Sequence, residues 1–505
     1  MSFCTVLSAA VQGLSVEMIR VEADVSNGLP MFHMVGYLSS EVKEASERVR
    51  TAIRNSGMKL PAKKIIVNLA PATVRKRGAS FDLPIALAVL AAMNYVPEEA
   101  LKGVAVIGEV SLEGKIRGVS GVLPIVMEAK NQGCTACILP EENEIEGRLV
   151  SGIKILPADN LEKLCAYLNG DEKEIHRKKQ GRSSAQRNIF ENKKEDFSDI
   201  CGQNAVKRAA EIAVAGGHNL LMAGPPGSGK SMIARRIATI LPELSLEESL
   251  EITRIYSVLG MIDKEQPLIT RRPFRSVHHT ITKTALVGGG MTPRPGEISM
   301  AHGGVLFLDE LAEFPRNVLE VLRQPLEEHQ IHIARNYGNF KFPAEFMLVA
   351  AMNPCPCGNY PDMQKCSCTP SQIQKYLGKV SQPFLDRMDL CIETPKVEYR
   401  ELDIERIGKK EEESSEVIRS RVVEARKLQK KRYEGTQIRT NSMLGPGEIR
   451  TYIPLGSAER KLMEKAFERM GLTARTYHKI LRVARTIADL DYSKKVTEKH
   501  LKEAI

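Results

Sequence analysis

The sequence has no long hydrophobic run. No stretch of its 505 residues approaches the roughly 20 consecutive apolar residues of a membrane-spanning helix. Residues 1–5 contain no basic lead to an apolar segment, so we expect no secretion signal. Ten cysteines without such a signal are typical of a reducing compartment, where thiols stay free or bind metal. We therefore expect a cytoplasmic protein with no membrane partner.

What is present is typical of a globular protein with several domains, with 43% hydrophobic and 27% charged residues. Residues 1–170 combine short apolar runs with helical patterns and predict a compact α/β domain. The charged, polar residues 171–195 predict a flexible linker. Residues 196–395 predict a second α/β domain, and residues 396–505 predict a lid of amphipathic helices. The net charge of +10 permits contact with nucleic-acid phosphates but does not prove it, because a basic solvated surface is also common.

The strongest motif lies between an apolar run at 219–223, which predicts a buried strand, and a helical pattern at 232–238. Glycines there let backbone N–H groups surround phosphates, and the helix N-terminus adds a favourable dipole. Lys230 supplies a positive charge to the β- and γ-phosphates, and the Ser231 hydroxyl is a ligand for Mg²⁺. The motif fits the phosphate-binding loop G-x-x-x-x-G-K-[ST] at every fixed position: Gly224, Pro225, Pro226, Gly227, Ser228, Gly229, Lys230 and Ser231.

Two further apolar runs end in polar residues and complete a nucleotide site. Residues 304–308 predict a buried strand that ends at Asp309, placed to hold Mg²⁺, and Glu310, placed to polarise the attacking water. The alternative is a strand followed by an acidic turn. Residues 347–352 predict another strand, and beside Asp309 in a parallel sheet Asn353 would order the water and the γ-phosphate. On its own, an asparagine at a strand end is usually a turn residue.

Two arginines are candidates for contact with the nucleotide. Arg387 lies between carboxylates in residues 384–390 and either makes a local ion pair or reaches the γ-phosphate of a neighbouring subunit. An arginine finger contributes about 10³–10⁵ in kcat, so its loss would be decisive. Arg475 would bring a second arginine to the nucleotide of its own subunit, and Arg482 and Arg485 lie nearby on the next predicted helix.

Four cysteines follow Asn353 in a polar loop at 355–368: Cys355, Cys357, Cys366 and Cys368. Their spacing, CxC-x8-CxC, suits tetrahedral Zn²⁺, because so polar a loop has little apolar packing to order it. The alternative is a loop with free thiols. Cys134 and Cys137 have no second pair nearby and precede an apolar run, which predicts that they belong to the core.

Taken together, GPPGSGKS, VLFLDE, AAMN, FLDRMD and LTAR resemble the motifs of AAA+ ATPases of the magnesium-chelatase-like branch, as do residues 295–304 and 322–327. With the N-terminal domain included, almost the whole chain resembles the YifB/ComM family. This resemblance implies an AAA+ P-loop core with a parallel sheet, a helical lid and a homo-hexameric ring with ATP sites between subunits. It also implies these roles: Lys230 and Ser231 for phosphate and Mg²⁺, Asp309 and Glu310 for Walker B, Asn353 for sensor 1, Arg387 for the finger and Arg475 for sensor 2.

The N-terminal domain resembles the proteolytic domain of Lon, a Ser-Lys protease with an α/β fold of the S5 domain 2-like type. Ser80, in Gly78-Ala79-Ser80, falls at the position of the nucleophile. The dyad needs a lysine base, but the aligned position is Ile125, which cannot accept a proton. We therefore expect the fold of the protease without its peptidase activity.

Three segments of the core are candidates for substrate contact: residues 271–279, 288–294 and 330–342. Related helicase-type AAA+ rings line their central channel with such insertions. Basic and aromatic residues there suit single-stranded nucleic acid, through phosphate contacts and stacking. The alternative is packing between subunits without DNA. The neighbouring His278 and His279 indicate a structural pair more than metal ligands.

The leading functional hypothesis is an ATP-driven ring motor. The resemblance implies a DNA helicase that drives branch migration or other DNA remodelling in recombination or natural transformation, with single-stranded or branched DNA and recombination proteins as partners. The alternative is a protein-remodelling or magnesium-chelatase-like ATPase whose N-terminal domain recruits a protein client. The sequence contains no D-x-S-x-S metal-adhesion motif, although a separate partner could supply one.

Overall fold

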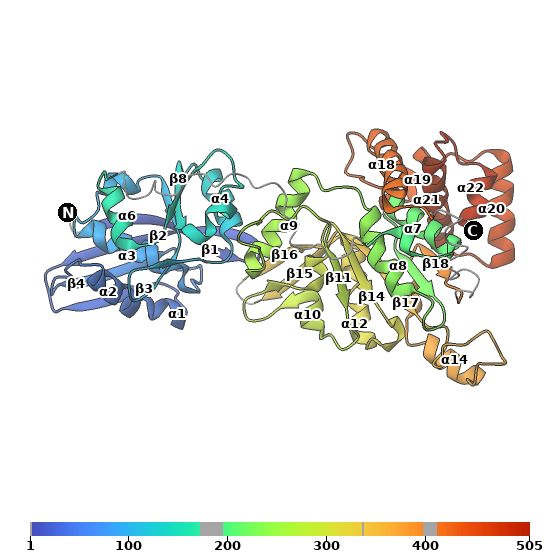
Figure 1. Cartoon of the computed structure of the whole chain (residues 1–505), viewed down its shortest axis with the longest axis horizontal. Coiled ribbons are helices and arrows are strands. Elements are labelled where there is room, and N and C mark those ends of the chain that lie inside the picture. The colour runs from blue at the N-terminus through green and yellow to red at the C-terminus, as the bar shows by residue number, and fades with distance from the viewer. Residues whose placement is uncertain (1–2, 172–194, 336–337, 397–411) are drawn as a thin grey trace.

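The computed structural model describes residues 3–171, 195–335, 338–396 and 412–505. The molecule is elongated, with the N-terminal residues at one end, a parallel sheet in the middle and the C-terminal helices at the other end (Figure 1). This arrangement confirms the predicted α/β fold class with a parallel sheet and a helical C-terminal region. The predicted linker lies outside the described residues apart from its two end residues, and the domain boundaries stay a prediction.

A seven-stranded sheet in the order β3-β4-β2-β1-β5-β8-β9 organises the N-terminal residues. Its strands, with the two of the small β6-β7 hairpin, are β1 (Phe3–Gln12), β2 (Ser15–Ser26), β3 (Met31–Val35), β4 (Lys64–Ala70), β5 (Val104–Val106), β6 (Glu109–Val110), β7 (Ile116–Arg117), β8 (Ala136–Pro140) and β9 (Lys154–Ala158). The helices are α1 (Ser40–Lys43), α2 (Ala45–Asn55), α3 (Asp82–Ala92), α4 (Val122–Asn131), α5 (Glu144–Gly147) and α6 (Leu161–Leu168), with short 3-10 turns at Ala79–Phe81, Glu98–Leu101 and Glu141–Asn143.

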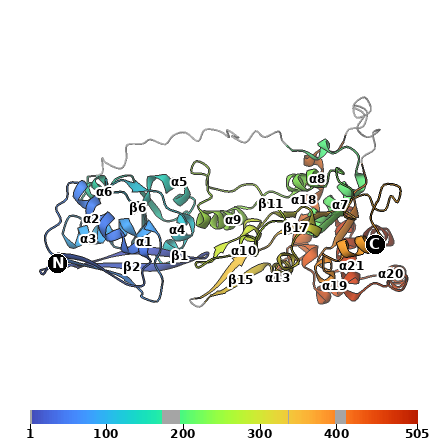
Figure 2. The same ribbon diagram turned by 90° about the horizontal axis from the view of Figure 1, so that it is seen from below.

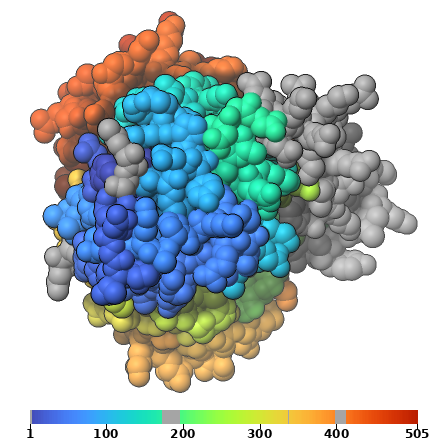
Figure 3. Space-filling model, turned by 90° about the vertical axis from the view of Figure 1, so that its left-hand side faces the viewer, coloured from blue at the N-terminus to red at the C-terminus, as the bar shows by residue number. Residues whose placement is uncertain are grey.

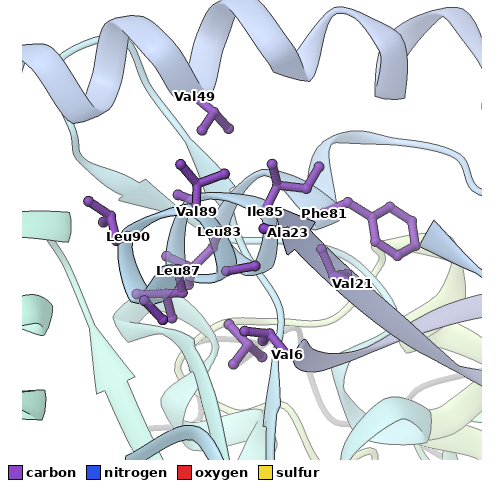
Figure 4. Packing of buried hydrophobic residues seen from close by; sticks show 14 of the residues in the cluster. Val6, Val21, Ala23, Val49, Phe81, Leu83, Ile85, Leu87, Val89 and Leu90 are labelled. Atoms are coloured by element: carbon purple, nitrogen blue, oxygen red, sulfur yellow. The ribbon is translucent and has the colours of Figure 1, made fainter. Parts of the chain in front are cut away.

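Helix α3 forms the centre of the N-terminal core. All of its residues are buried, as its nearly uninterrupted apolar sequence DLPIALAVLAA requires. Figure 4 shows its side chains between α2, which contributes Val49, and the strands β1 and β2. The one charged residue of α3, Asp82, is paired with Arg48 of α2 at 2.8 Å, so that its burial leaves no charge without a partner.

A five-stranded parallel sheet in the order β11-β14-β17-β10-β18 forms the central region. The strands there are β10 (Leu220–Ala223), β11 (Phe274–Val277), β12 (Gly288–Gly289), β13 (Arg294–Pro295), β14 (Val305–Leu308), β15 (Gln330–Arg335), β16 (Gly338–Pro343), β17 (Met347–Met352) and β18 (Leu390–Glu393). The helices are α7 (Asn204–Gly216), α8 (Lys230–Ile237), α9 (Leu246–Leu259), α10 (Lys283–Val287), α11 (Glu297–Met300), α12 (Arg316–Glu320), α13 (Arg323–Glu328), α14 (Pro370–Leu377) and α15 (Gln382–Leu385), with 3-10 turns at Phe197–Asp199, Ala238–Ile240 and Leu311–Glu313.

Both faces of this parallel sheet are covered. Helices α7 and α8 pack on one face, and α9, α11 and α12 belong to the core on the other. The strand sequences LLMA, VLFL and MLVAAM are accordingly apolar throughout instead of alternating. This burial explains why short apolar runs predicted these three strands.

The C-terminal residues form a helical layer against α7. The helices are α18 (Ser415–Arg432), α19 (Pro446–Tyr452), α20 (Ser457–Met470), α21 (Ala474–Leu490) and α22 (Glu498–Ala504), with a 3-10 turn at Asn441–Met443. Buried Asp489 accepts hydrogen bonds from Arg432, Arg485 and Asn441, which ties α18 to α21. None of the helices that the structure describes combines the length and the apolar character needed to cross a membrane.

The N-terminal sheet is anchored on the central region. The β1–β2 turn inserts Leu14 into the central core, and Arg254 of α9 donates to its carbonyl oxygen. Buried Glu146 accepts from the Ser257 hydroxyl at 2.6 Å and from the Leu123 N–H at 2.9 Å. Figure 2 shows β1 and β2 running toward β15, and Figure 3 looks along the long axis at the N-terminal end, with the other two regions behind it. The N-terminal region is therefore packed against the core in addition to being linked to it in sequence.

Candidate nucleotide-binding site

The predicted nucleotide residues meet at one edge of the central sheet. Strands β10, β17 and β14 pair in parallel with Ala223 opposite Met352 and Leu308 opposite Ala350. The residues that follow these strands therefore share the carboxyl edge of the sheet. They are the phosphate-binding loop, Asn353 and Asp309, and they form the constellation that the sequence predicts.

Glycine is required at several points of the phosphate-binding loop. Gly227 and Gly229 have φ values of +75° and +84°, which favour residues without a Cβ atom. A Cβ atom at Gly224 would overlap the carbonyl oxygen of Thr394, so the loop must pass close to that backbone. Lys230 then begins α8, which directs the N-terminus of the helix toward the loop.

Lys230 is held inside the loop. Its Nζ atom donates to the carbonyl oxygens of Gly224 at 2.7 Å and Pro225 at 2.9 Å, and lies 3.4 Å from Oδ1 of Asn353. Burial lowers the pKa of Lys230, and the charge of Asp309 opposes that shift. The oxygens of a nucleotide phosphate can replace these carbonyl acceptors, which suits a loop lysine that binds phosphate as a point charge.

Asp309 and Glu310 lie at the end of β14 with different surroundings. Asp309 Oδ2 accepts from the Ser231 hydroxyl at 2.6 Å, which joins the two predicted Mg²⁺ ligands. Glu310 has φ of +52°, a conformation that costs energy for any residue other than glycine and that is concentrated at functional sites. Its exposed carboxylate projects beyond the strand, as a residue that acts on water must do.

His279 is a neighbour of this site that sequence reasoning missed. Its Nδ1 atom lies 3.3 Å from Oε2 of Glu310, and its ring lies 4.0 Å from that of His278. The sequence indicates a structural histidine pair, and the pair does form. Nothing in the sequence indicates that one member reaches Glu310.

Arg387 lies at the opposite edge of the sheet. It precedes β18, whose first residue pairs with the first residue of β10, and its carbonyl oxygen accepts from Asn219 at 3.0 Å. Its guanidinium is largely buried and donates to Oε1 of Glu327 at 2.6 Å. The full length of β10 therefore separates Arg387 from the phosphate-binding loop of its own chain.

Arg475 donates to the same oxygen of Glu327, also at 2.6 Å. The structure thus brings Arg475 together with Arg387, whereas Lys230 contacts Asn353 and loop carbonyls. Arg482 donates to the Ser442 carbonyl and Arg485 to Asp489, so both are used within the C-terminal helices. Glu327 joins residues 60 and 148 positions away in sequence, and no local pattern indicates such a pairing.

The four cysteines of the loop after Asn353 come together. One sulfur from each of Cys355, Cys357, Cys366 and Cys368 lies within 4.8 Å of the others. Cys355 Sγ is 3.4 Å from Cys357 Sγ and 3.8 Å from Cys366 Sγ. Tetrahedral coordination with Zn–S bonds of about 2.3 Å places sulfurs about 3.8 Å apart, so the donor set fits one zinc ion.

The other predicted cysteine pair is part of the core. Cys134 and Cys137 are both buried, as predicted. Burial raises the pKa of the Cys137 thiol to about 12, which keeps it protonated and unreactive.

The candidate substrate segments are only partly exposed. Phe340 and Phe342 are buried beside Leu14, so the prediction that aromatic residues of β16 stack on nucleic acid is wrong for these two. Alternation in the hairpin places Ile331 and Ile333 on the same buried face and exposes His332 and Lys341 on the other. Tyr337 lies outside the described residues.

The basic residues of the first segment have structural partners. Arg275 makes two hydrogen bonds to Glu297, at 2.7 and 2.8 Å, and Arg272 donates to the carbonyl oxygens of Pro242 and Gly303. These contacts hold both side chains within their own chain, and they do not test the predicted alternative of packing between subunits for residues 271–279. By contrast, Arg335 at the end of β15 is exposed and donates to the Gly290 carbonyl, which joins the two hairpins.

In α4 of the N-terminal region, the position that aligns with the lysine of the Lon dyad is Ile125, not a lysine. Ile125 is buried among apolar residues of that helix, and Ser80 lies in the 3-10 turn before α3. A different lysine, Lys76, is fully buried and donates to the Pro71 carbonyl oxygen. Burial lowers the pKa of Lys76 to about 8. Sequence reasoning missed Lys76 because it stands in the basic run Arg75-Lys76-Arg77, which is typical of an exposed surface.

Comparison with known proteins assigns this constellation to a class. The family described as magnesium chelatase, subunit ChlI matches residues 196–402, and its C-terminal counterpart matches residues 412–505. A further family, subunit ChlI of Mg-chelatase, matches residues 21–143. The matched regions and the site define a magnesium-chelatase-like AAA+ ATPase.

Relatives similar to the full chain narrow the assignment. The uncharacterized protein YifB of Escherichia coli K12 is 44% identical over 505 residues, which cover 100% of this chain and 97% of YifB. The competence protein ComM of Haemophilus influenzae is 42% identical over 512 residues, with the same coverage. Lon protease of Trichlorobacter lovleyi is 26% identical over 160 residues, 29% of this chain and 19% of Lon. The chain belongs to the YifB/ComM family.

We expect the residues that bind ATP to differ from the residue that activates water for hydrolysis. In Glu310→Gln, we expect kcat of ATP hydrolysis to fall about 10²–10⁴-fold, because the amide cannot polarise the attacking water. The KM for ATP should change little, since Lys230 and Ser231 remain in place. Steady-state ATPase kinetics measure both values. Glu247→Gln, an exposed carboxylate at the start of α9, is the matched control. A Glu310→Gln enzyme with unchanged kcat would contradict the assignment.

Proposed function

We propose that this protein is an ATP-driven ring motor that acts on DNA, most simply as a helicase or branch-migration ATPase in recombination or natural transformation. The observation that carries the motor assignment is the placement of Lys230 and Arg387 at opposite edges of one sheet. A complete site then needs two chains. The similarity to a relative named competence protein ComM supports the DNA part of the proposal. Recombination proteins in the cytoplasm are the partners this function requires.

The hydrolysis step follows from the residues at the carboxyl edge. Lys230 and the loop N–H groups bind the β- and γ-phosphates, and Ser231 with Asp309 provides the ligands for Mg²⁺. Glu310 polarises a water that attacks the γ-phosphorus, the bond to the β–γ bridging oxygen breaks, and ADP leaves with that oxygen. Asn353, beside Lys230, orients the water and the γ-phosphate.

The neighbouring subunit supplies the arginines. Glu327 holds Arg387 and Arg475 side by side. In the proposed ring, both guanidinium groups turn from this carboxylate to the γ-phosphate of the adjacent chain. Positive charge at that point stabilises the charge of the transition state. In this arrangement Arg475 acts on a neighbour's nucleotide, in contrast to the prediction from sequence. A closed homo-hexameric ring gives every chain one such neighbour.

The DNA-contacting surface is the exposed face of the β15–β16 hairpin together with the β12–β13 turn. His332 and Lys341 pair across the two strands, and Arg335 links the hairpin to Gly290. Met291, in that turn, is 73% exposed. With Phe340 and Phe342 buried, phosphate contact is the mode of binding that the exposed residues support.

The four-cysteine cluster holds Zn²⁺ in this proposal. Four sulfurs at the spacing of a tetrahedral thiolate site favour zinc over free thiols, because unligated cysteines have no need of so close a grouping.

The N-terminal region has no role as a peptidase in the proposed function. We expect no hydrolysis of an unfolded protein substrate, with or without ATP, because Ile125 cannot act as a base for Ser80. Ser80→Ala and Lys76→Met should both match the wild-type chain in a fluorogenic peptidase assay. Peptidase activity that disappears in Ser80→Ala would overturn this expectation, and its additional loss in Lys76→Met would identify the buried lysine as the base.

DNA action is tested by binding and ATPase measurements. We expect single-stranded or branched DNA to stimulate the ATPase of the assembled ring. In Lys341→Ala, log Kd plotted against log salt should lose about 1 in slope for each phosphate contact removed. Fluorescence anisotropy over a salt series with an ATP analogue measures the slope, and Lys427→Ala on α18 is the control. An assembled ring that neither binds DNA nor responds to it would reject this proposal and favour the protein-remodelling alternative.

A further inference from the structure

The four-cysteine segment lies against the phosphate-binding loop. Cys355 stands two residues after Asn353, and Gly358 within the segment faces Pro226 of the loop. A Cβ atom at Gly358 would overlap Cδ of Pro226 and lie 2.7 Å from its Cγ. The two segments are therefore in direct contact, without space for one additional methyl group.

Two of the four sulfurs, those of Cys355 and Cys357, have backbone donors of the kind found around metal-bound thiolates. The Tyr360 N–H donates to Cys355 Sγ at 3.4 Å, and backbone groups of Asn359 and Ser367 hydrogen-bond to Cys357. Such N–H donors neutralise charge on ligand sulfurs and fix their orientation. Residues 360–365 are exposed, so this part of the segment has little buried apolar surface that would hold its shape.

The far end of the segment returns to the nucleotide site. Helix α14 begins two residues after Cys368, and its Tyr376 is buried in the central core and shares a hydrogen bond with the Asn353 backbone. Lys379, just after the helix, donates to Glu313 at 3.0 Å, three residues beyond Glu310. Figure 1 shows α14 below β17, on the side of the molecule where the phosphate-binding loop leads into α8.

We propose that zinc in the four-cysteine site holds Gly358 against Pro226 and thereby keeps the phosphate-binding loop in its nucleotide-binding shape. Zinc occupancy then sets the affinity for ATP, although the ion itself does not touch the nucleotide. The inference rests on the proposed zinc and nucleotide sites, and it does not depend on DNA as the substrate.

The experiment compares metal content with nucleotide affinity in the full chain without DNA. Wild-type protein, purified in reductant without added metal, should contain one zinc ion per chain by mass spectrometry. Cys357→Ser with Cys366→Ser should lose zinc, and Kd for a fluorescent ATP analogue should rise about tenfold or more. Gly358→Ala should keep its zinc yet weaken nucleotide binding by a similar factor, because the added methyl group pushes Pro226 away.

The matched control is Gly435→Ala. Gly435 has the same φ of +80° as Gly358 but no atom near the added Cβ, so it shares the backbone strain without the contact. It should bind zinc and nucleotide as the wild type does. The proposal is overturned if wild-type protein contains no metal, or if it contains a metal other than zinc. It is also overturned if Gly358→Ala binds nucleotide as tightly as Gly435→Ala. Since Gly358→Ala retains the metal ligands, misfolding of the cysteine variant does not decide the outcome.

Discussion

Parallel pairing of β14, β17 and β10 is the constraint on which the rest of the site depends. Because parallel strands end at the same edge of a sheet, the pairing brings Lys230, Asp309 and Asn353 together from positions up to 123 residues apart. The short hydrogen bond from Ser231 to Asp309 then joins the two residues that we propose as ligands of one metal ion. Burial of the apolar strands on both faces of the sheet stabilises this parallel pairing. The polar residues then lie where the strands end.

The same sheet is the basis for the proposal that one chain is insufficient. β18 pairs with β10 from its first residue, which places Arg387 at the amino edge and its carbonyl against Asn219. The Glu327 carboxylate keeps Arg475 at that position too. In the proposed ring, with binding elements at one edge and arginines at the other, each chain contributes half of two sites. A motor can use such an arrangement because the rate of ATP hydrolysis then depends on where the neighbouring chain lies.

Much of this could be predicted from the sequence, and the remainder depends on long-range contacts. The phosphate-binding loop and its flanking strand and helix follow from local residues. The structure confirms the strand predicted at 219–223 and the helix predicted at 232–238, and it shows that they begin at Leu220 and Lys230. Alternation correctly predicts the β15–β16 hairpin, but it cannot identify which face is covered. Phe340 is buried in the same core as Leu14, more than 300 residues away, and lies next to Gly13 of the β1–β2 turn. The shared use of Glu327 by two arginines likewise has no local signal.

The central claim is that each ATP site is shared between two chains, and mixing two inactive variants tests it most directly. Lys230→Ala and Arg387→Ala should each lose ATPase activity alone. In an equal mixture that assembles at random, about one seam in four joins an intact Lys230 to an intact Arg387, so ATPase activity should return to about a quarter of the wild-type value. A mixture as inactive as its components, or an Arg387→Ala protein with wild-type turnover, would contradict the account.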